Sequence, residues 1–164
     1  MAKDTACDTC ILINFALVDR VDLLTAVTEL KLCIPLDVWA EMERPDLKSV
    51  VEAYINSGHL HLVQLDSPEE LALFATYNQV LGKGESACLA IAETRGWAIA
   101  TDESKDRKWR RSIAGKNLQI FNTQALILRS IRAGRIDVKE ADAIKAVLEA
   151  NRFRLPINSF ADLL

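Results

Sequence analysis

Apolar and polar positions repeat along the chain with two periods, one typical of strands and the other typical of helices. Short apolar or alternating runs predict strands that end near Asp8 and that cover residues 32–34, 59–65, 97–101 and 118–121. Helical periods lie between and after them, at residues 10–18, 21–31, 36–44, 46–57, 68–81, 85–95, 102–111, 124–134 and 137–153. This order predicts an α/β fold in three α/β/α layers, with an open, mostly parallel sheet between helices.

The composition is that of an ordinary globular protein. Of the 164 residues, 50% are hydrophobic and 26% are charged, which is enough to bury a core without disulfides. We therefore predict one domain over residues 1–164, with the helices of 122–164 packed on it. No apolar run reaches the roughly 20 residues that span a bilayer, and the first ten residues do not resemble a targeting segment. We expect a cytoplasmic protein with no membrane contact and with reduced cysteines.

Charge is distributed unevenly along the sequence. The formal net charge is -3, yet residues 105–116 contain six cations and one acidic residue. This run predicts a basic patch that steers the phosphate backbone of RNA, with a tryptophan stacked on a base. The alternative is a solvated helix face whose tryptophan points into the core. The residues predicted to contact RNA are Lys105, Arg107, Lys108, Trp109, Arg110 and Arg111.

Two carboxylates follow predicted strands directly. Asp8 comes after the first strand, and Asp102 comes after the strand at 97–101. Because ligands of open parallel sheets bind outside the carboxyl ends of the strands, both side chains would point into one crevice if their strands are neighbours. The alternative for each residue is a simple N-cap of the following helix.

Two further acids, Glu41 and Glu85, complete the candidate site. An alternative role for Glu85 is to stabilise a helix N-terminus, and one for Glu41 is exposed pairing with Arg44. Converging carboxylates stay ionised only when cations compensate them, and oxygen ligands suit Mg2+ or Mn2+. Such ions activate water and neutralise a phosphodiester, so neither His59 nor His61 is needed as a base.

Four segments of the chain carry a resemblance to a known family. The segments are DTCILINFA at 8–16, IPLDVWAEM at 34–42, GESACLAIA at 84–92 and ATDESKDRKWR at 100–110. Together they resemble the PIN-domain family, which includes the ribonuclease toxins of bacterial toxin–antitoxin pairs. The resemblance spans most of the chain and implies a Mg2+- or Mn2+-dependent endoribonuclease, with RNA, a protein antitoxin and a second copy of the chain as partners. The metal ligands that it implies are Asp8, Glu41, Glu85 and Asp102.

The chain departs from the family pattern at two positions. Cys10 stands where serine or asparagine is usual, and Glu103 stands where a second aspartate is common, which makes Glu103 a weaker ligand candidate. Asp106 is expected one helical turn beyond Asp102, within reach of the same crevice. The segment from residue 122 through NRFRL at 151–155 resembles a subgroup of PIN proteins predicted to bind nucleic acids. Other residues that could support the site are Thr9, Asn14 and Thr123.

Three other interpretations of the sequence remain. Cys7 and Cys10 form a C-x-x-C pair, which is found in redox proteins and zinc sites. A PIN-like module could bind RNA or a protein without cutting it, although clustered acids near phosphate would not help such a binder. A phosphatase could instead use Asp8 as its nucleophile.

Overall fold

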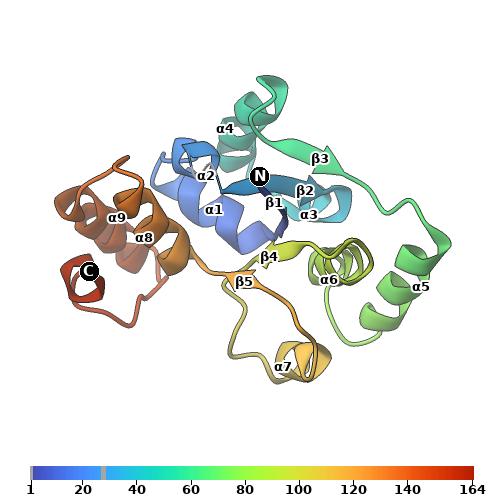
Figure 1. Ribbon diagram of the computed structural model, residues 1–164. Helices are drawn as coiled ribbons and strands as arrows, with labels where there is room; N and C mark the ends of the chain where they lie inside the picture. Colours follow the sequence, from blue (N-terminus) through green and yellow to red (C-terminus); the bar gives the residue numbers. More distant parts are fainter. Residues whose placement is uncertain (1, 27–28) are drawn as a thin grey trace.

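Five parallel strands form one open sheet in the order β3-β2-β1-β4-β5 (Figure 1). The computed structural model describes residues 2–26 and 29–164. The strands are β1 (Lys3–Cys7), β2 (Leu30–Pro35), β3 (His61–Val63), β4 (Ala98–Ala100) and β5 (Ile120–Phe121). The predicted parallel sheet is confirmed.

The helices of the described residues lie on both sides of this sheet. They are α1 (Thr9–Leu17), α2 (Asp22–Ala26), α3 (Leu36–Glu41), α4 (Pro45–Asn56), α5 (Pro68–Tyr77), α6 (Lys83–Arg95), α7 (Arg107–Ile113), α8 (Thr123–Arg132) and α9 (Val138–Ala150), followed by the 3-10 helix η1 (Phe160–Leu163). Figure 1 shows α1, α2, α8 and α9 on one side of the sheet and α5 and α6 on the other. The three-layer α/β/α architecture is therefore confirmed.

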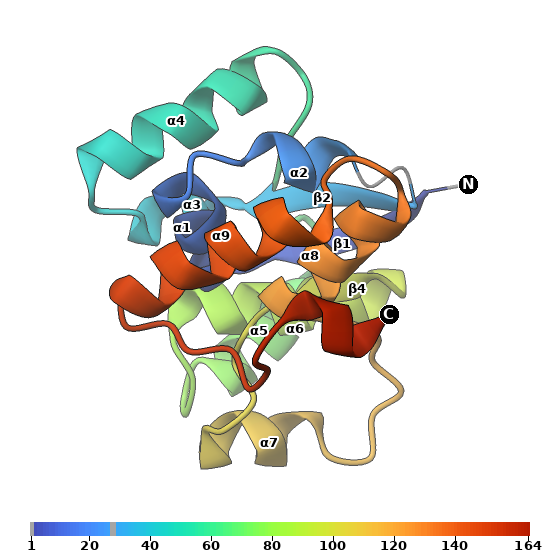
Figure 2. The same ribbon diagram turned by 90° about the vertical axis from the view of Figure 1, so that its left-hand side faces the viewer.

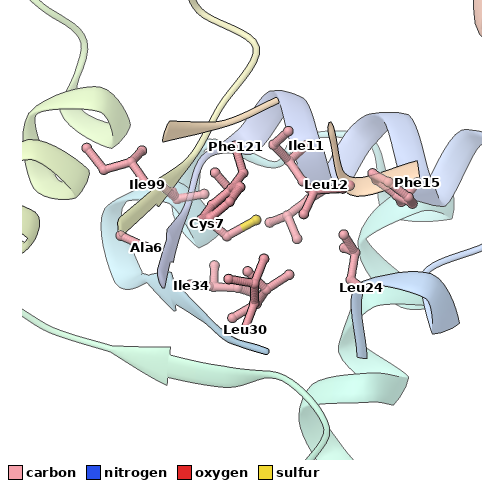
Figure 3. Packing of buried hydrophobic residues seen from close by; sticks show 14 of the residues in the cluster. Ala6, Cys7, Ile11, Leu12, Phe15, Leu24, Leu30, Ile34, Ile99 and Phe121 are labelled. Carbon is pink, nitrogen blue, oxygen red and sulfur yellow. The ribbon is translucent and has the colours of Figure 1, made fainter. Parts of the chain in front are cut away.

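The central strands and the helices beside them make the core. Ala6 and Cys7 of β1 are fully buried, as are Ile11 and Leu12 of α1. Cys7 lies near Ile11 and Leu12 between helix and sheet, whereas Ala6 points to the opposite face (Figure 3). Helix α6 is buried along residues 86–92, as expected for a helix that is apolar around most of its girth. Burial of α1 and α6 holds the first turn of each helix firmly at the sheet.

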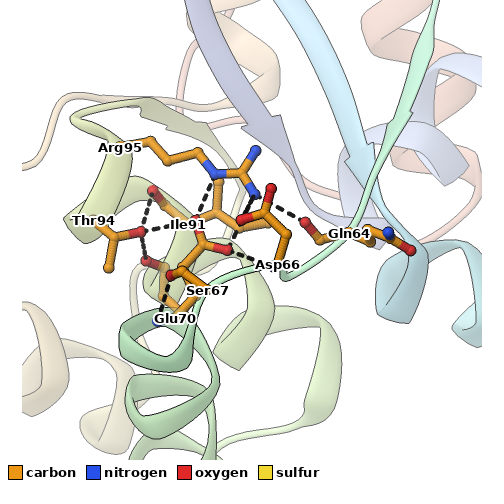
Figure 4. A network of polar contacts seen from close by, with 8 residues as sticks. Gln64, Asp66, Ser67, Glu70, Ile91, Thr94 and Arg95 are labelled. Atoms are coloured by element: carbon orange, nitrogen blue, oxygen red, sulfur yellow. Dashed lines mark hydrogen bonds and ion pairs between the residues drawn. The ribbon is translucent and has the colours of Figure 1, made fainter.

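An ion pair joins α5 to α6 on the outer side of the sheet. Arg95 donates to both carboxylate oxygens of Glu70, with an Nε to Oε1 distance of 2.5 Å, and Thr94 donates to the same carboxylate (Figure 4). These hydrogen bonds, those from Arg95 first, lower the pKa of the buried Glu70 to about 2. The network fixes the position of α6, whose first turn carries Glu85.

Several predicted helix boundaries are wrong. The helix predicted at 21–31 ends at Ala26; residues 27–28 lie outside the described residues, and residues 30–31 belong to β2. The helix predicted at 68–81 ends at Tyr77. The helix predicted at 36–44 ends at Glu41, before Pro45 opens the next helix.

The largest difference lies after β4, where the predicted helix 102–111 begins only at Arg107. Glu103 donates its backbone N–H to Thr101 Oγ1 at 3.1 Å, and Asp106 caps α7 by accepting from the N–H groups of Lys108 and Trp109. Side chains that bond to nearby backbone groups in this way compete with helix formation. Residues 102–106 are therefore a loop at the sheet edge.

Among the helices of residues 2–26 and 29–164, none has the length and the apolar character needed to cross a membrane.

Candidate active site

Asp8 lies in the turn between β1 and α1, where it is 7% exposed. Its Oδ1 accepts from the N–H of Thr9 at 2.8 Å, and its Oδ2 accepts from Thr101 Oγ1 at 3.0 Å. Asp8 therefore caps α1, as the alternative interpretation predicted, but only its Oδ1 takes part in the cap. Thr101 directly follows β4, so the second bond fastens Asp8 to the neighbouring strand.

Asp102 lies beside Asp8 because β1 and β4 are paired. Cys7 and Ala100 are partners in the parallel register, so the two strands end at the same level of the sheet. Asp102 accepts from the N–H of Thr123 at 2.7 Å, from Thr123 Oγ1 at 2.6 Å and from Asn14 Nδ2 at 3.0 Å. Asp8 and Asp102 were expected to lie together if their strands were neighbours, and β1 and β4 are neighbours. The middle of α1 and the first turn of α8 fix the Asp102 carboxylate.

Glu41 reaches the same edge of the sheet from the last residue of α3. Its Oε2 accepts from Thr9 Oγ1 at 3.0 Å, and its Oε1 accepts from the N–H of Gly84 at 2.8 Å. Arg44 pairs with Asp46 instead, at 2.8 Å. The alternative of an exposed Glu41–Arg44 pair is therefore wrong. Glu41 faces α1 and the first turn of α6.

Glu85 belongs to that first turn of α6 and is half-buried. Burial first, and then the nearby charges of Asp8, Glu103, Asp106 and Glu41, together raise its pKa to about 7. The effect of these charges shows that Glu85 shares one acidic environment with Asp8 and Glu41. We call Asp8, Glu41, Glu85 and Asp102 the acidic centre.

The acidic centre carries negative charge without basic partners. Within the described residues, no ion pair involves any of its four carboxylates. Burial is the main reason that the pKa of Asp8 and that of Asp102 are raised, although hydrogen bonds to Thr101 and Thr123 oppose the shift. Carboxylates in such surroundings favour either a proton or a bound cation.

The chemistry of the donors fits a hard divalent cation. All four side chains offer carboxylate oxygens, which Mg2+ and Mn2+ prefer. In residues 2–26 and 29–164, however, no three Asp, Glu, His or Cys side chains are already grouped closely enough to hold one ion. Binding would therefore draw the carboxylates together from the hydrogen-bonded positions described above.

The cysteines do not fit a thiolate site. All four are free, and burial raises the pKa of Cys7 and that of Cys10, the latter to about 12. Both groups are therefore neutral thiols at ordinary pH, which argues against a redox pair or a zinc site. Cys10 Sγ instead accepts from the N–H of Asp102 at 3.3 Å and so helps to hold the loop after β4.

Glu103 and Asp106 lie in the loop after β4, and the predicted RNA contacts lie in this loop and on α7. Glu103 is half-buried, and its Oε1 accepts from the N–H of Asp106 at 3.3 Å. Asp106 does not follow Asp102 on a helix, as predicted, but caps α7 within electrostatic reach of Glu85. Of the residues predicted to contact RNA, those that are exposed are Lys105, Arg107, Lys108, Arg110 and Arg111.

Trp109 is 1% exposed and packs into the core. The prediction that it stacks on a base is therefore wrong, because α7 turns this side chain toward the protein. Thr101, which donates to Asp8, was not among the residues predicted for the site. A polar residue at the end of a buried strand was the available signal.

Comparisons with known proteins identify the family of this chain. Among the solved structures, the chain is similar to the crystal structure of PAE2754 from Pyrobaculum aerophilum, with 19% sequence identity and a TM-score of 0.47 over 83% of this chain and 100% of that chain. No curated protein sequence matches the chain. The model of the family DUF3368, described as PIN domain, matches residues 4–164. This chain therefore belongs to the PIN-domain family.

Proposed function

We propose that this protein is a metal-dependent endoribonuclease that hydrolyses phosphodiester bonds of RNA with Mg2+ or Mn2+. The observation that carries the proposal is the acidic centre at the carboxyl ends of neighbouring strands, whose carboxylates have no basic partner among the described residues. Membership of the PIN-domain family supports it, because proteins of that family are generally nucleases.

The four carboxylates divide the work of the site. Asp8 and Asp102 are the best-fixed ligand candidates, since backbone and hydroxyl donors hold each of them. Glu41 and Glu85, on two other helices, lie within electrostatic reach of Asp8. A divalent cation, when bound, supplies activation of water and neutralises charge on the phosphodiester. Glu85 exchanges its proton near neutral pH, because its pKa is raised to about 7.

The exposed cations of the loop after β4 and of α7 are the proposed electrostatic guide for the substrate. Lys105, Arg107 and Lys108 are exposed close to Asp106 in sequence, and Arg110 and Arg111 follow them on α7. A local excess of positive charge beside an acidic site attracts the phosphate backbone. Trp109 has no part in this contact.

Cleavage of labelled single-stranded RNA tests the proposal. We would compare purified wild type with Mn2+, wild type with EDTA, and the variants Asp8→Asn and Asp102→Asn. The matched control is Glu52→Gln, which removes an exposed carboxylate from α4. The proposal predicts cutting that needs the metal and both aspartates and that Glu52→Gln preserves.

Other results would support the alternatives. RNA that is bound but not cut by any preparation indicates a binding module. A phosphorylated Asp8, trapped with a phosphate ester, indicates a phosphatase. Cutting that persists in EDTA or in both aspartate variants indicates a contaminating nuclease.

The family resemblance also suggests the biological setting of the activity. We propose a cytoplasmic toxin that forms a homodimer and whose protein antitoxin covers the acidic centre. Induced expression in a bacterial host should then arrest growth, and Asp8→Asn should not. Size-exclusion chromatography with light scattering measures the oligomeric state directly.

A further inference from the structure

An open cavity of about 820 Å3 lies next to the acidic centre. Its walls are the loop after β4, the first turn of α8 and residues 152–156, which follow α9. Figure 2 shows this last segment running back past the chain that leads to α7. Asp102 is part of the wall, so the cavity adjoins the acidic centre at this residue. Its volume falls within the roughly 300–1,000 Å3 of known small-ligand sites.

The walls of the cavity carry three cations, the two carboxylates of Asp102 and Glu103, and an aromatic ring. Lys105, Arg152 and Arg154 contribute to its walls and are exposed, and none of them belongs to an ion pair of the described residues. Phe153 lies between the two arginines in sequence; it is half-buried and packs against the core. Proteins that bind single strands combine these two features, cations for the backbone and aromatic faces for the bases.

A buried polar atom in the wall also lacks a partner. Gln124 lines the cavity from the first turn of α8, and its Oε1 is buried without a hydrogen-bond donor among the described residues. Buried polar atoms are normally satisfied, so a ligand that carries a donor would satisfy this oxygen once the Gln124 side chain turns toward the cavity. The exocyclic amino groups of RNA bases and the ribose 2′-hydroxyl are such donors.

The backbone at Arg152 gives an independent reason to assign a role to its side chain. Arg152 follows the C-cap of α9 with a φ of 68°, and its N–H donates to Glu149 O at 3.1 Å. Helix α6 ends in the same left-handed conformation, but with Gly96, at a φ of 69°. Glycine is the favoured residue here because a Cβ is strained at positive φ. An arginine in this position makes the folded protein less stable than a glycine would, and its charged side chain lines the cavity.

We propose that this cavity binds the nucleotide of single-stranded RNA that adjoins the phosphodiester at the acidic centre. Arg152, Arg154 and Lys105 hold its phosphates, Phe153 stacks on its base, and Gln124 accepts a hydrogen bond from it. The proposal rests on the proposed ribonuclease function, which provides RNA as the occupant. Residues 152–156 thereby become a substrate-binding segment of the protein.

Fluorescence anisotropy with a labelled single-stranded RNA tests this assignment. EDTA is present so that binding is measured without metal-dependent cleavage. Arg152→Gly relieves the backbone strain, so its Tm should equal or exceed that of wild type while its Kd rises about tenfold. The salt dependence of its binding should also weaken by about one phosphate contact. Phe153→Ala should raise the Kd about tenfold as well.

The matched control is Arg135→Ala, which removes an exposed arginine beyond the end of α8 that lies away from Asp102. It should leave the Kd within about twofold of wild type, because only nonspecific attraction is lost. An equal loss in Arg135→Ala and Arg152→Gly would overturn the proposal in favour of general charge attraction.

Two further outcomes separate this proposal from the proposed function. If Arg152→Gly and Phe153→Ala bind RNA as wild type does, the cavity is not the RNA site, whereas metal-dependent cutting that needs Asp8 still establishes the nuclease. If the wild type does not bind RNA at all, the assignment of the cavity fails, and the cleavage assay decides the ribonuclease activity on its own.

Discussion

The N–H of Gly84 donates a hydrogen bond to Glu41 Oε1 at 2.8 Å, and a side chain at position 84 would disturb this contact. A Cβ built on Gly84 would lie 2.5 Å from Glu41 Oε2. The same Oε2 accepts from Thr9 Oγ1 at 3.0 Å. The first turns of α1 and α6 therefore fix together a carboxylate that α3 carries.

Gly84→Ala should displace Glu41 without unfolding the protein. Position 84 is helical, where alanine is more favourable than glycine by up to about 1 kcal/mol. This gain offsets part of the loss of stability that the close contact with Glu41 causes. RNA cleavage should fall about 10- to 100-fold, the usual cost of disturbing residues that orient metal ligands. Single-turnover cleavage and thermal denaturation measure the two effects separately.

Gly82→Ala is the matched control for this variant. A Cβ at Gly82 would lie 3.8 Å from Glu85 Oε1 and 3.9 Å from Glu41 Oε1, which are ordinary contacts. Its activity should stay within about twofold of wild type, although alanine is a poorer N-cap than glycine. Equal losses of activity in both variants would contradict a specific role for the Gly84–Glu41 contact.

Thr123→Val should weaken the hold on Asp102. Valine keeps the shape of threonine but removes the Oγ1 donor, which lies 2.6 Å from Asp102 Oδ2, while the backbone bond to Oδ1 stays. The free energy of unfolding should fall by about 1–2 kcal/mol, because the partly buried carboxylate loses a donor. The Mn2+ concentration for half-maximal cleavage should rise about tenfold.

Thr76→Val provides the comparison for Thr123→Val. Thr76 is exposed on α5, and its hydroxyl donates to the carbonyl of Ala72 in the same helix. The metal requirement of this variant should be unchanged. A higher metal requirement in both variants would mean that the effect does not pass through Asp102.

The parallel sheet and its first two carboxylates were predictable because they follow from local patterns. Apolar runs marked β1 and β4, and Asp8 and Asp102 followed them directly. The rule that parallel strands gather their carboxyl ends at one edge then placed both acids together. The sequence did not show that β1 and β4 are neighbours, since pairing is a tertiary property.

Residues whose roles depend on distant partners were harder to predict. The polar residues 102–106 have a helical composition, but hydrogen bonds to Thr101 and Asp106 keep them in a loop. Trp109 lies in a basic run, which suggested contact with RNA, and only its burial in the fold shows that it belongs to the core. The cavity beside Asp102 needs residues 152–156 from the end of the chain, and no local pattern brings them there. The single-domain interpretation of residues 1–164 stays a prediction.

Glu70→Gln should destabilise the protein at neutral pH by about 3 kcal/mol, because it leaves Arg95 without its buried partner. The pKa of Glu70 is lowered from 4.5 to about 2, chiefly by hydrogen bonds from Arg95. Above pH 4.5 the carboxylate is ionised in folded and unfolded chains, and its contribution is fully present. As the pH falls, the unfolded chain takes up the proton first, so the contribution declines and is lost through about pH 2.

Urea denaturation between pH 3 and pH 7 measures this difference. The gap between wild type and Glu70→Gln should shrink as the pH falls. Asp46→Asn removes the carboxylate of an exposed ion pair with Arg44 and should have no measurable effect. A gap that does not depend on pH would show that Glu70 stabilises the protein by packing and not by its charge.

Glu85 should make the metal-free protein less stable as the pH rises. Burial first, and the charge of Asp8 next, raise its pKa from 4.5 to about 7. Below pH 4.5 the group is protonated in folded and unfolded chains and costs nothing. Between pH 4.5 and 7 the unfolded chain ionises first, so stability falls, and above about pH 7 the full cost is present. Glu85→Gln should remove this part of the pH dependence, which Tm values measured in EDTA will show.

A divalent cation should reverse the cost, because it binds the ionised carboxylates of the folded chain and not the unfolded chain. Mn2+ should therefore raise the Tm of wild type more at pH 8 than at pH 5, where protons compete for the same oxygens. Glu85→Gln and Asp8→Asn should both reduce the shift at pH 8, whereas Glu52→Gln on α4 should preserve it. A Tm that Mn2+ does not change at pH 8 would argue against a cation at the acidic centre, whatever the cleavage assay shows.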